Sequence, residues 1–135
     1  MIIGIPRESL PGENRVAATP TTVPALLKLG YEVVVESGAG EHAAQPDRAY
    51  EAAGARIVEP GEAWKADLVL AVNEPIDDQI ALMRAGAVLV TFLHPRQDLA
   101  LTEKLAAAGV TGLSMDMVPR ISRAQSMDAL SSMAN

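Results

Sequence analysis

Short apolar runs alternate along the chain with segments that carry helix-start and helix-stop signals. Several of these runs are apolar at nearly every position, which is typical of parallel strands covered on both faces. We expect strands at residues 2–5, 32–36, 55–58, 68–72, 87–92 and 110–114. Between them, a β-α-β alternation predicts right-handed crossovers and a doubly wound, mainly parallel sheet. The expected fold class is a three-layer α/β fold, Rossmann-like or flavodoxin-like, forming a single domain over residues 1–135.

The expected helices lie between these strands. Thr19 and Pro20 place a capping residue before a proline at the first helical position, and this helix should run to Gly30. Further helices are expected at 46–53, from 77 to a close at 84–86, and at 98–108. Acidic residues at 77 and 78 favour a helix N-terminus there, because they complement the helix dipole.

Composition narrows the class of protein. The 135 residues carry a formal net charge of -6, which argues against a general nucleic-acid surface, since phosphate neutralisation needs clustered cations. No cysteine is present, so disulfides and thiolate chemistry are excluded. No apolar run approaches the ~20 residues of a membrane span, and the start lacks a signal-peptide pattern. We therefore expect a cytoplasmic protein that does not itself insert into a membrane.

The final segment, residues 119–135, is polar yet amphipathic. It holds two arginines, a glutamine, an aspartate and four serines. At helical spacing Met127 and Leu130 share one side, whereas Gln125, Asp128 and Ser131 share the other. The segment reads as a polar loop that runs into an unfinished helix, with a binding site beside a domain boundary.

Arg120, Gln125 and Asp128 leave two interpretations open. An arginine paired with an aspartate can fix a loop that offers a glutamine amide to a flat polar ligand. Alternatively, Gln125 completes a capping box with Ser122, and Asp128 complements the helix dipole. The residue pattern alone does not separate these alternatives.

A second group of polar residues follows the first, fourth and fifth expected strands, where open parallel sheets form a ligand crevice. Arg15 is suited to clamp a carboxylate or phosphate, or to form a salt bridge with a neighbouring acid. A histidine before a proline, as at His94, is more often structural than catalytic. The group consists of Arg7, Glu8, Glu13, Asn14, Arg15, Asn73, Glu74 and His94.

Residues 38–43 formally match the dinucleotide fingerprint G-x-G-x-x-A after a strand. The fingerprint requires its glycines to open a helix, but Pro46 predicts a later helix start, and Glu41 would face the phosphates. We interpret these residues as a plain glycine turn. The sequence shows no P-loop, no nucleophile elbow and no metal-ligand spacing.

Residues 119–135 resemble the signature of the alpha subunit of proton-translocating NAD(P) transhydrogenase. Residues 5–20 and 35–40 are similar to the start of the same subunit, and less specifically to alanine dehydrogenases. The resemblance implies hydride transfer between NADH and NADP+, coupled to proton movement. It also implies a second Rossmann-like domain, carrying the glycine fingerprint, that is absent from this chain.

The same resemblance implies specific roles and partners. Arg120, Gln125 and Asp128 would contribute to the nicotinamide side of NAD(H), with Ser126, Met127 and Ser131 as further cofactor contacts. NADP(H) would be bound by a partner component, and a membrane-embedded component would hold this homodimeric part at the inner membrane. This 135-residue chain alone is expected to be inactive.

Two alternatives remain. An alanine dehydrogenase would act on a 2-oxo acid with residues similar to Arg15 and His94, but that family has a lysine where this chain has Asn73. Loss of a charge-assisted carboxylate anchor of this kind costs roughly 1.5–3 kcal/mol. The other alternative is a non-catalytic, truncated domain that acts only in oligomerisation.

Overall fold

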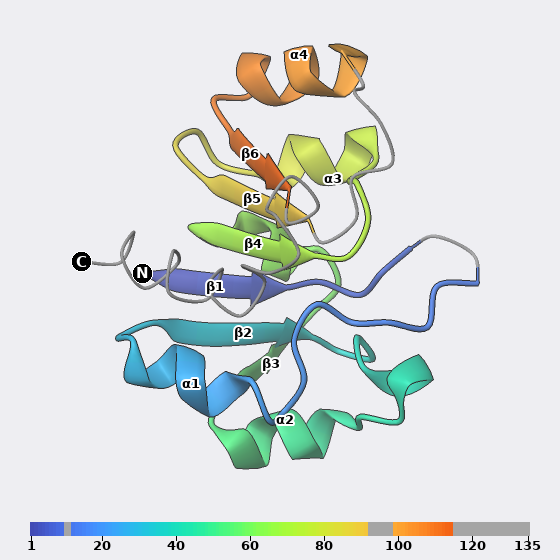
Figure 1. The fold of residues 1–135 in the computed structure, drawn as a ribbon, viewed down its shortest axis with the longest axis vertical. Coiled ribbons are helices and arrows are strands. Elements are labelled where there is room, and N and C mark those ends of the chain that lie inside the picture. The colour runs from blue at the N-terminus through green and yellow to red at the C-terminus, as the bar shows by residue number, and fades with distance from the viewer. Residues whose placement is uncertain (10–11, 92–98, 115–135) are drawn as a thin grey trace, which may run out of the picture.

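The computed structural model describes residues 1–9, 12–91 and 99–114. Its centre is a six-stranded, all-parallel sheet in the order β3-β2-β1-β4-β5-β6 (Figure 1). The strands are β1 (Ile2–Ile5), β2 (Glu32–Glu36), β3 (Arg56–Val58), β4 (Leu68–Ala71), β5 (Val88–Thr91) and β6 (Thr111–Ser114). This order is that of the Rossmann fold and not of flavodoxin, so it confirms the first of the two expected α/β folds.

The helices of the described ranges are α1 (Val23–Lys28), α2 (Asp47–Ala53), α3 (Asp77–Leu82) and α4 (Leu99–Ala107). Two short 3-10 helices that the sequence pattern did not indicate, η1 (Glu41–Ala43) and η2 (Glu62–Lys65), follow β2 and β3. No helix in these ranges is long and apolar enough to cross a membrane.

The expected start of the first helix was wrong. Residues 19–22 form a turn in which Thr22 N–H donates to the Thr19 carbonyl at 2.9 Å, and α1 begins only at Val23. The proline in its first turn is Pro24 and not Pro20. The sequence contains two threonine-then-proline patterns close together, and the second one marks the helix start.

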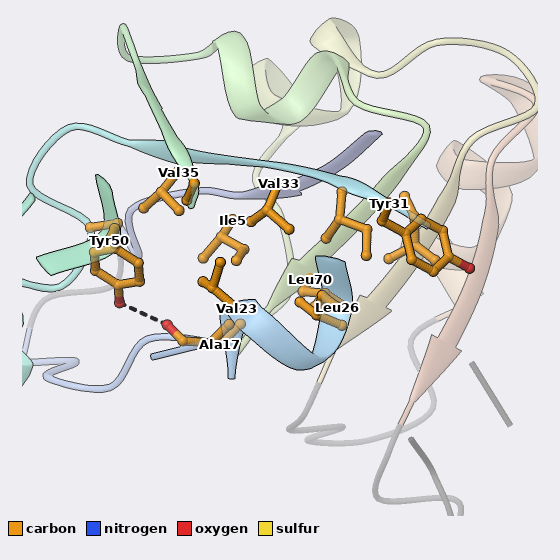
Figure 2. Close-up of a cluster of buried hydrophobic side chains, with 14 of the residues drawn as sticks. Ile5, Ala17, Val23, Leu26, Tyr31, Val33, Val35, Tyr50 and Leu70 are labelled. Carbon is orange, nitrogen blue, oxygen red and sulfur yellow. Dashed lines mark hydrogen bonds between the residues drawn. The ribbon is translucent and has the colours of Figure 1, made fainter. Parts of the chain in front are cut away.

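Apolar side chains on the two faces of the sheet form two separate cores. On one face, Ile3 and Ile5 pack with α1 and α2, and Val69 and Leu89 on the other face pack with η2, α3 and α4. Figure 2 shows the first core, in which Val23, Leu26 and Tyr50 cover the strands. The fully buried Tyr50 hydroxyl donates to the Ala18 carbonyl at 2.7 Å, which fixes the chain before α1. The result is the expected three-layer arrangement.

Close contact between β1 and η2 depends on a glycine. A Cβ placed at Gly4 would overlap the carbonyl of Ala63 and crowd the Cβ of Ala66. Ala63 lies within η2 and Ala66 directly follows it, so no flexible side-chain end is available to move. The absence of a side chain at Gly4 therefore sets how closely η2 covers the centre of the sheet.

We expect Gly4→Ala to lower the free energy of unfolding by about 3 kcal/mol, because it overpacks a backbone contact. Gly112→Ala in β6 is a matched control, since its new Cβ meets only the Leu105 Cδ1 end, at 3.1 Å. The control should stay within about 1 kcal/mol of the original protein. Urea unfolding of both variants measures the difference, and equal stabilities would contradict the assigned contact.

Candidate functional site

The strand order reverses between β1 and β4, so the crevice of this sheet lies beyond their carboxyl ends. The chain leaving β1 carries Glu8, and the chain leaving β4 carries Asn73. β1 and β4 are hydrogen-bonded neighbours in the sheet, so the two segments that leave them start side by side. On its other side, β1 pairs with β2. The side chains after β1 and β4 therefore meet at one place, as the sequence predicts.

Glu8 connects these two segments directly. Its Oε2 accepts the N–H of Val72 at 2.9 Å, and its Oε1 accepts the N–H of Asn73 at 3.1 Å. The Asn73 side-chain amide lies 3.4 Å from the same Oε1. Burial raises the pKa of the Glu8 carboxyl, and these hydrogen bonds oppose the rise. Glu8 thus holds the end of β4 against the loop that follows β1.

Arg15 is paired with Glu13 in a two-bond fork. The Arg15 Nε and Nη2 donate to the two carboxylate oxygens of Glu13, each at 2.8 Å, and the Arg15 N–H donates to the same group at 2.9 Å. The Glu13 side chain is 5% exposed, whereas that of Arg15 is 59% exposed. Hydrogen bonding from Arg15 lowers the pKa of Glu13 to about 2. Arg15 was expected either to clamp a ligand anion or to form a salt bridge with a neighbouring acid, and the structure shows the salt bridge.

Asn73 joins the two acidic groups into one network. Its Nδ2 donates to Glu13 Oε1 at 2.8 Å and faces Glu8 Oε1 at 3.4 Å. A neutral amide therefore lies between two carboxylates, and Arg15 supplies the cation that balances one of them. Asn14, from the same loop, is exposed. The sequence places Glu8, Glu13 and Asn73 in one crevice, but their pairing depends on a loop conformation that spacing does not specify.

The glycine turn after β2 is structural. The Gly38 N–H, which a dinucleotide fingerprint would offer to phosphate, donates to Asp47 Oδ1 at 2.9 Å. Ser37 Oγ donates to the other carboxylate oxygen at 3.0 Å, and α2 begins only at Asp47. A Cβ at Gly40 would lie 2.5 Å from the Gln45 carbonyl oxygen, so this glycine is required for packing. The expected late start of the α-helix is therefore confirmed, although residues 41–43 form the short 3-10 helix η1 and not a plain turn.

Sequence reasoning missed Glu36, at the carboxyl end of β2. Its side chain is buried, and its Oε1 accepts the Gly61 N–H at 3.3 Å. Burial raises the pKa of this carboxyl. Glu36, Arg7, Glu8 and Gln79 line a cavity of about 400 Å³ on the η2 and α3 side of the crevice. An acidic residue directly after the three consecutive valines of β2 was the available signal.

The residues expected to contact NAD(H) lie outside the described ranges. They are Arg120, Gln125, Ser126, Met127, Asp128 and Ser131, and His94 lies outside them as well. Their assigned roles stay predictions. Within residues 1–9, 12–91 and 99–114, no group of three or more His, Cys, Asp or Glu side chains is arranged to hold a metal ion.

Residues 4–135 match the family model described as "Alanine dehydrogenase/PNT, N-terminal domain". The chain belongs to this family. It is 53% identical, over its whole length, to the NAD(P) transhydrogenase subunit alpha of Haemophilus influenzae, and it spans 26% of that relative. It is 41% identical over 119 residues to the alanine dehydrogenase of Bacillus subtilis, with 87% of this chain and 32% of the relative covered.

Solved structures agree with this assignment. The transhydrogenase from Sinorhizobium meliloti superposes with a TM-score of 0.86 at 42% identity, covering 96% of this chain and 39% of that one. An L-alanine dehydrogenase gives a TM-score of 0.78 at 36% identity, covering 84% and 32%. The chain thus spans between a quarter and two fifths of the relatives that it matches.

The Glu13–Arg15 pair predicts a pH dependence of stability. The folded-state pKa of Glu13 is about 2, below its ordinary value of 4.5, so the pair stabilises the fold above pH 4.5. This contribution is lost as the pH falls from 4.5 to 2. In Arg15→Met the loss should be largely absent, so the difference in urea midpoint between protein and variant should shrink over that window.

Arg56→Met is the matched control, because Arg56 is an exposed arginine at the start of β3. Its midpoint difference from the original protein should not vary in the same way between pH 6 and pH 2. If the Arg15→Met difference is constant over this range, the fork does not contribute to the folded state in solution.

Proposed function

We propose that this chain is the N-terminal part of the NAD(H)-binding component of NAD(P) transhydrogenase, which transfers hydride between NADH and NADP+ with coupled proton translocation. The observation that carries the proposal is the extent of similarity. The relatives named as transhydrogenase alpha subunits match 100% of the chain, residues 119–135 included, at up to 53% identity. The alanine dehydrogenases match 87% of it at 40–42% identity.

The proposed cofactor contacts come from residues 119–135. Arg120, Gln125 and Asp128 would hold the nicotinamide side, and Ser126, Met127 and Ser131 would add contacts to it. NAD(H) supplies the hydride chemistry when bound. Direct hydride transfer requires position, orientation and exclusion of water, and it requires no general acid or base. Donor and acceptor side chains without a nucleophile suit that requirement.

The described residues are consistent with cofactor contacts that come from other parts of the subunit. At the carboxyl edge of the sheet, the amides of Gly38, Val72 and Asn73 already have carboxylate partners from the chain itself. The pyrophosphate of a dinucleotide therefore has no free amide cradle at these three positions. This supports a second domain with a true glycine fingerprint, beyond residue 135 in the complete subunit, as the place where the phosphates bind.

The remaining partners follow from the same proposal. NADP(H) would bind to a separate component, and a membrane-embedded component would carry the proton. The subunit would act as a homodimer on the cytoplasmic side of the inner membrane. Relatives named as subunits of transhydrogenase support the existence of partner components.

The site is tested in the complete subunit by Asp128→Asn and Gln125→Ala. We expect each to lower the rate of hydride transfer to an NADP+ analogue at least about tenfold, or 1.4 kcal/mol, without unfolding the domain. Asp78→Asn is the matched control, since Asp78 lies in the first turn of α3 and complements its dipole. If Asp128→Asn impairs transfer no more than this control, Asp128 serves only the helix.

The 135-residue chain by itself is expected to show little or no transhydrogenase activity, because it spans only part of its relatives. The measurement is hydride transfer from NADH to an NADP+ analogue after addition of the NADP-binding component. A rate equal to that of the complete subunit would contradict the proposed division between two domains.

An alanine dehydrogenase is the second candidate, favoured by 41% identity to the Bacillus subtilis enzyme. Against it, the crevice has the neutral Asn73 between two carboxylates, and the fork of Arg15 is engaged by Glu13. A small anionic substrate would meet little free positive charge there. Alanine-dependent reduction of NAD+ by the complete subunit would favour this candidate over the first.

A further inference from the structure

Among the described residues, several side-chain carboxylates accept peptide N–H groups at the carboxyl edge of the sheet. Glu13 accepts that of Arg15 within the loop after β1. Glu8 binds those of Val72 and Asn73, Asp47 binds that of Gly38, and Glu36 binds that of Gly61. In open parallel sheets, this edge is where ligands bind. In the described part of this fold, the chain itself provides anions at that edge.

Glu8 makes the most complete of these contacts. Each of its carboxylate oxygens accepts one N–H from two consecutive residues, and the Asn73 amide faces the same group. Successive peptide N–H groups directed at one point are a common way for proteins to bind an oxyanion. The geometry is that of a ligand site, and its ligand is a side chain.

The surroundings would accept a free anion in place of Glu8. Without the Glu8 charge, the acid that contacts Asn73 is Glu13, which Arg15 neutralises in their fork. The cavity beside Glu8 is also lined by the cation Arg7 and by the acids Glu36 and Asp78. The Glu8 side chain also lines the cavity of about 400 Å³, so its removal would connect the two N–H groups to that cavity. Leaving these part-buried N–H groups without an acceptor is unfavourable, which favours capture of an anion.

We propose that the N–H groups of Val72 and Asn73, with the Asn73 side-chain amide, form an oxyanion-binding site that Glu8 fills as an internal ligand. A small carboxylate or inorganic phosphate binds there once the Glu8 carboxylate is removed. In the unaltered protein, Glu8 outcompetes free anions because a tethered ligand acts at an effective concentration of millimolar or more. The proposal does not depend on the hydride-transfer function.

The experiment is an anion titration of Glu8→Ala in the 135-residue chain, followed by the NMR amide signals of Val72 and Asn73. We expect saturable shifts with sodium acetate, at a Kd at least about tenfold below that of the unaltered protein, and no saturable shifts with sodium chloride at equal ionic strength. A parallel titration with inorganic phosphate shows whether a tetrahedral anion also fits. Binding of either oxyanion supports the site.

Two control variants remove the same charge elsewhere. Glu51→Ala lies on the exposed side of α2 and should gain no acetate binding at Val72 and Asn73. Asp47→Ala frees one peptide N–H, at Gly38, and not two consecutive ones, so it should bind acetate more weakly than Glu8→Ala. Equal binding by all three variants would mean a general loss of charge repulsion and would overturn the proposal.

The remaining outcomes are also decisive. A folded Glu8→Ala variant that binds neither acetate nor phosphate overturns the proposal, as does an unaltered protein that binds them equally well. If Glu8→Ala is unfolded in dilute buffer, circular dichroism during the same titrations provides the readout. Saturable recovery of structure with acetate or phosphate but not with chloride supports the site, and no such recovery overturns it.

Discussion

Peptide N–H groups at the carboxyl edge of a parallel sheet must find acceptors, because a buried donor left without one costs about 1–3 kcal/mol. This constraint governs the centre of the fold. At the end of β4, the acceptor for Val72 and Asn73 is the Glu8 carboxylate, which arrives from the neighbouring strand β1. The same contact that satisfies the backbone therefore joins the two halves of the sheet where its strand order reverses.

The conformation of the loop after β1 follows from that contact. Once Glu8 holds Asn73, the Asn73 amide is directed at Glu13, and Glu13 in turn holds the fork of Arg15. Arg15 ends the network as an exposed cation on a nearly buried carboxylate. The network has one amide between two acids, so it depends on the charge of Arg15, which balances Glu13, and on the N–H donors of Asn73.

The alternation of apolar runs and helix signals was sufficient to predict the sheet, because strands buried on both faces have few other interpretations. The ends of some strands shifted by one residue, as at β3 and β4. The start of α1 was not predictable from capping rules alone, since Thr19-Pro20 and Thr22-Val23-Pro24 both satisfy them. Tertiary contacts decide between such signals, among them the hydrogen bond from Tyr50 to Ala18.

The candidate site was likewise predictable from the sequence only in part. The position of Pro46 was enough to predict that the glycine turn is structural, because it places the start of the α-helix after the glycines. The sequence did not decide whether Arg15 pairs with Glu13 or faces a ligand, since a side chain in a loop can take either direction. The roles of Asp47 and Glu36 required the fold, because each carboxylate meets an N–H group from a separate element.

Strand order and ligand binding are separable properties of this domain. The order β3-β2-β1-β4-β5-β6 is the one used by dinucleotide-binding domains, yet the crevice that it creates is bridged by side chains of the chain itself. A fold with the architecture of a nucleotide site can therefore serve as a rigid platform, whose ligand contacts come from segments attached to it. On the proposed function, residues 119–135 are that segment.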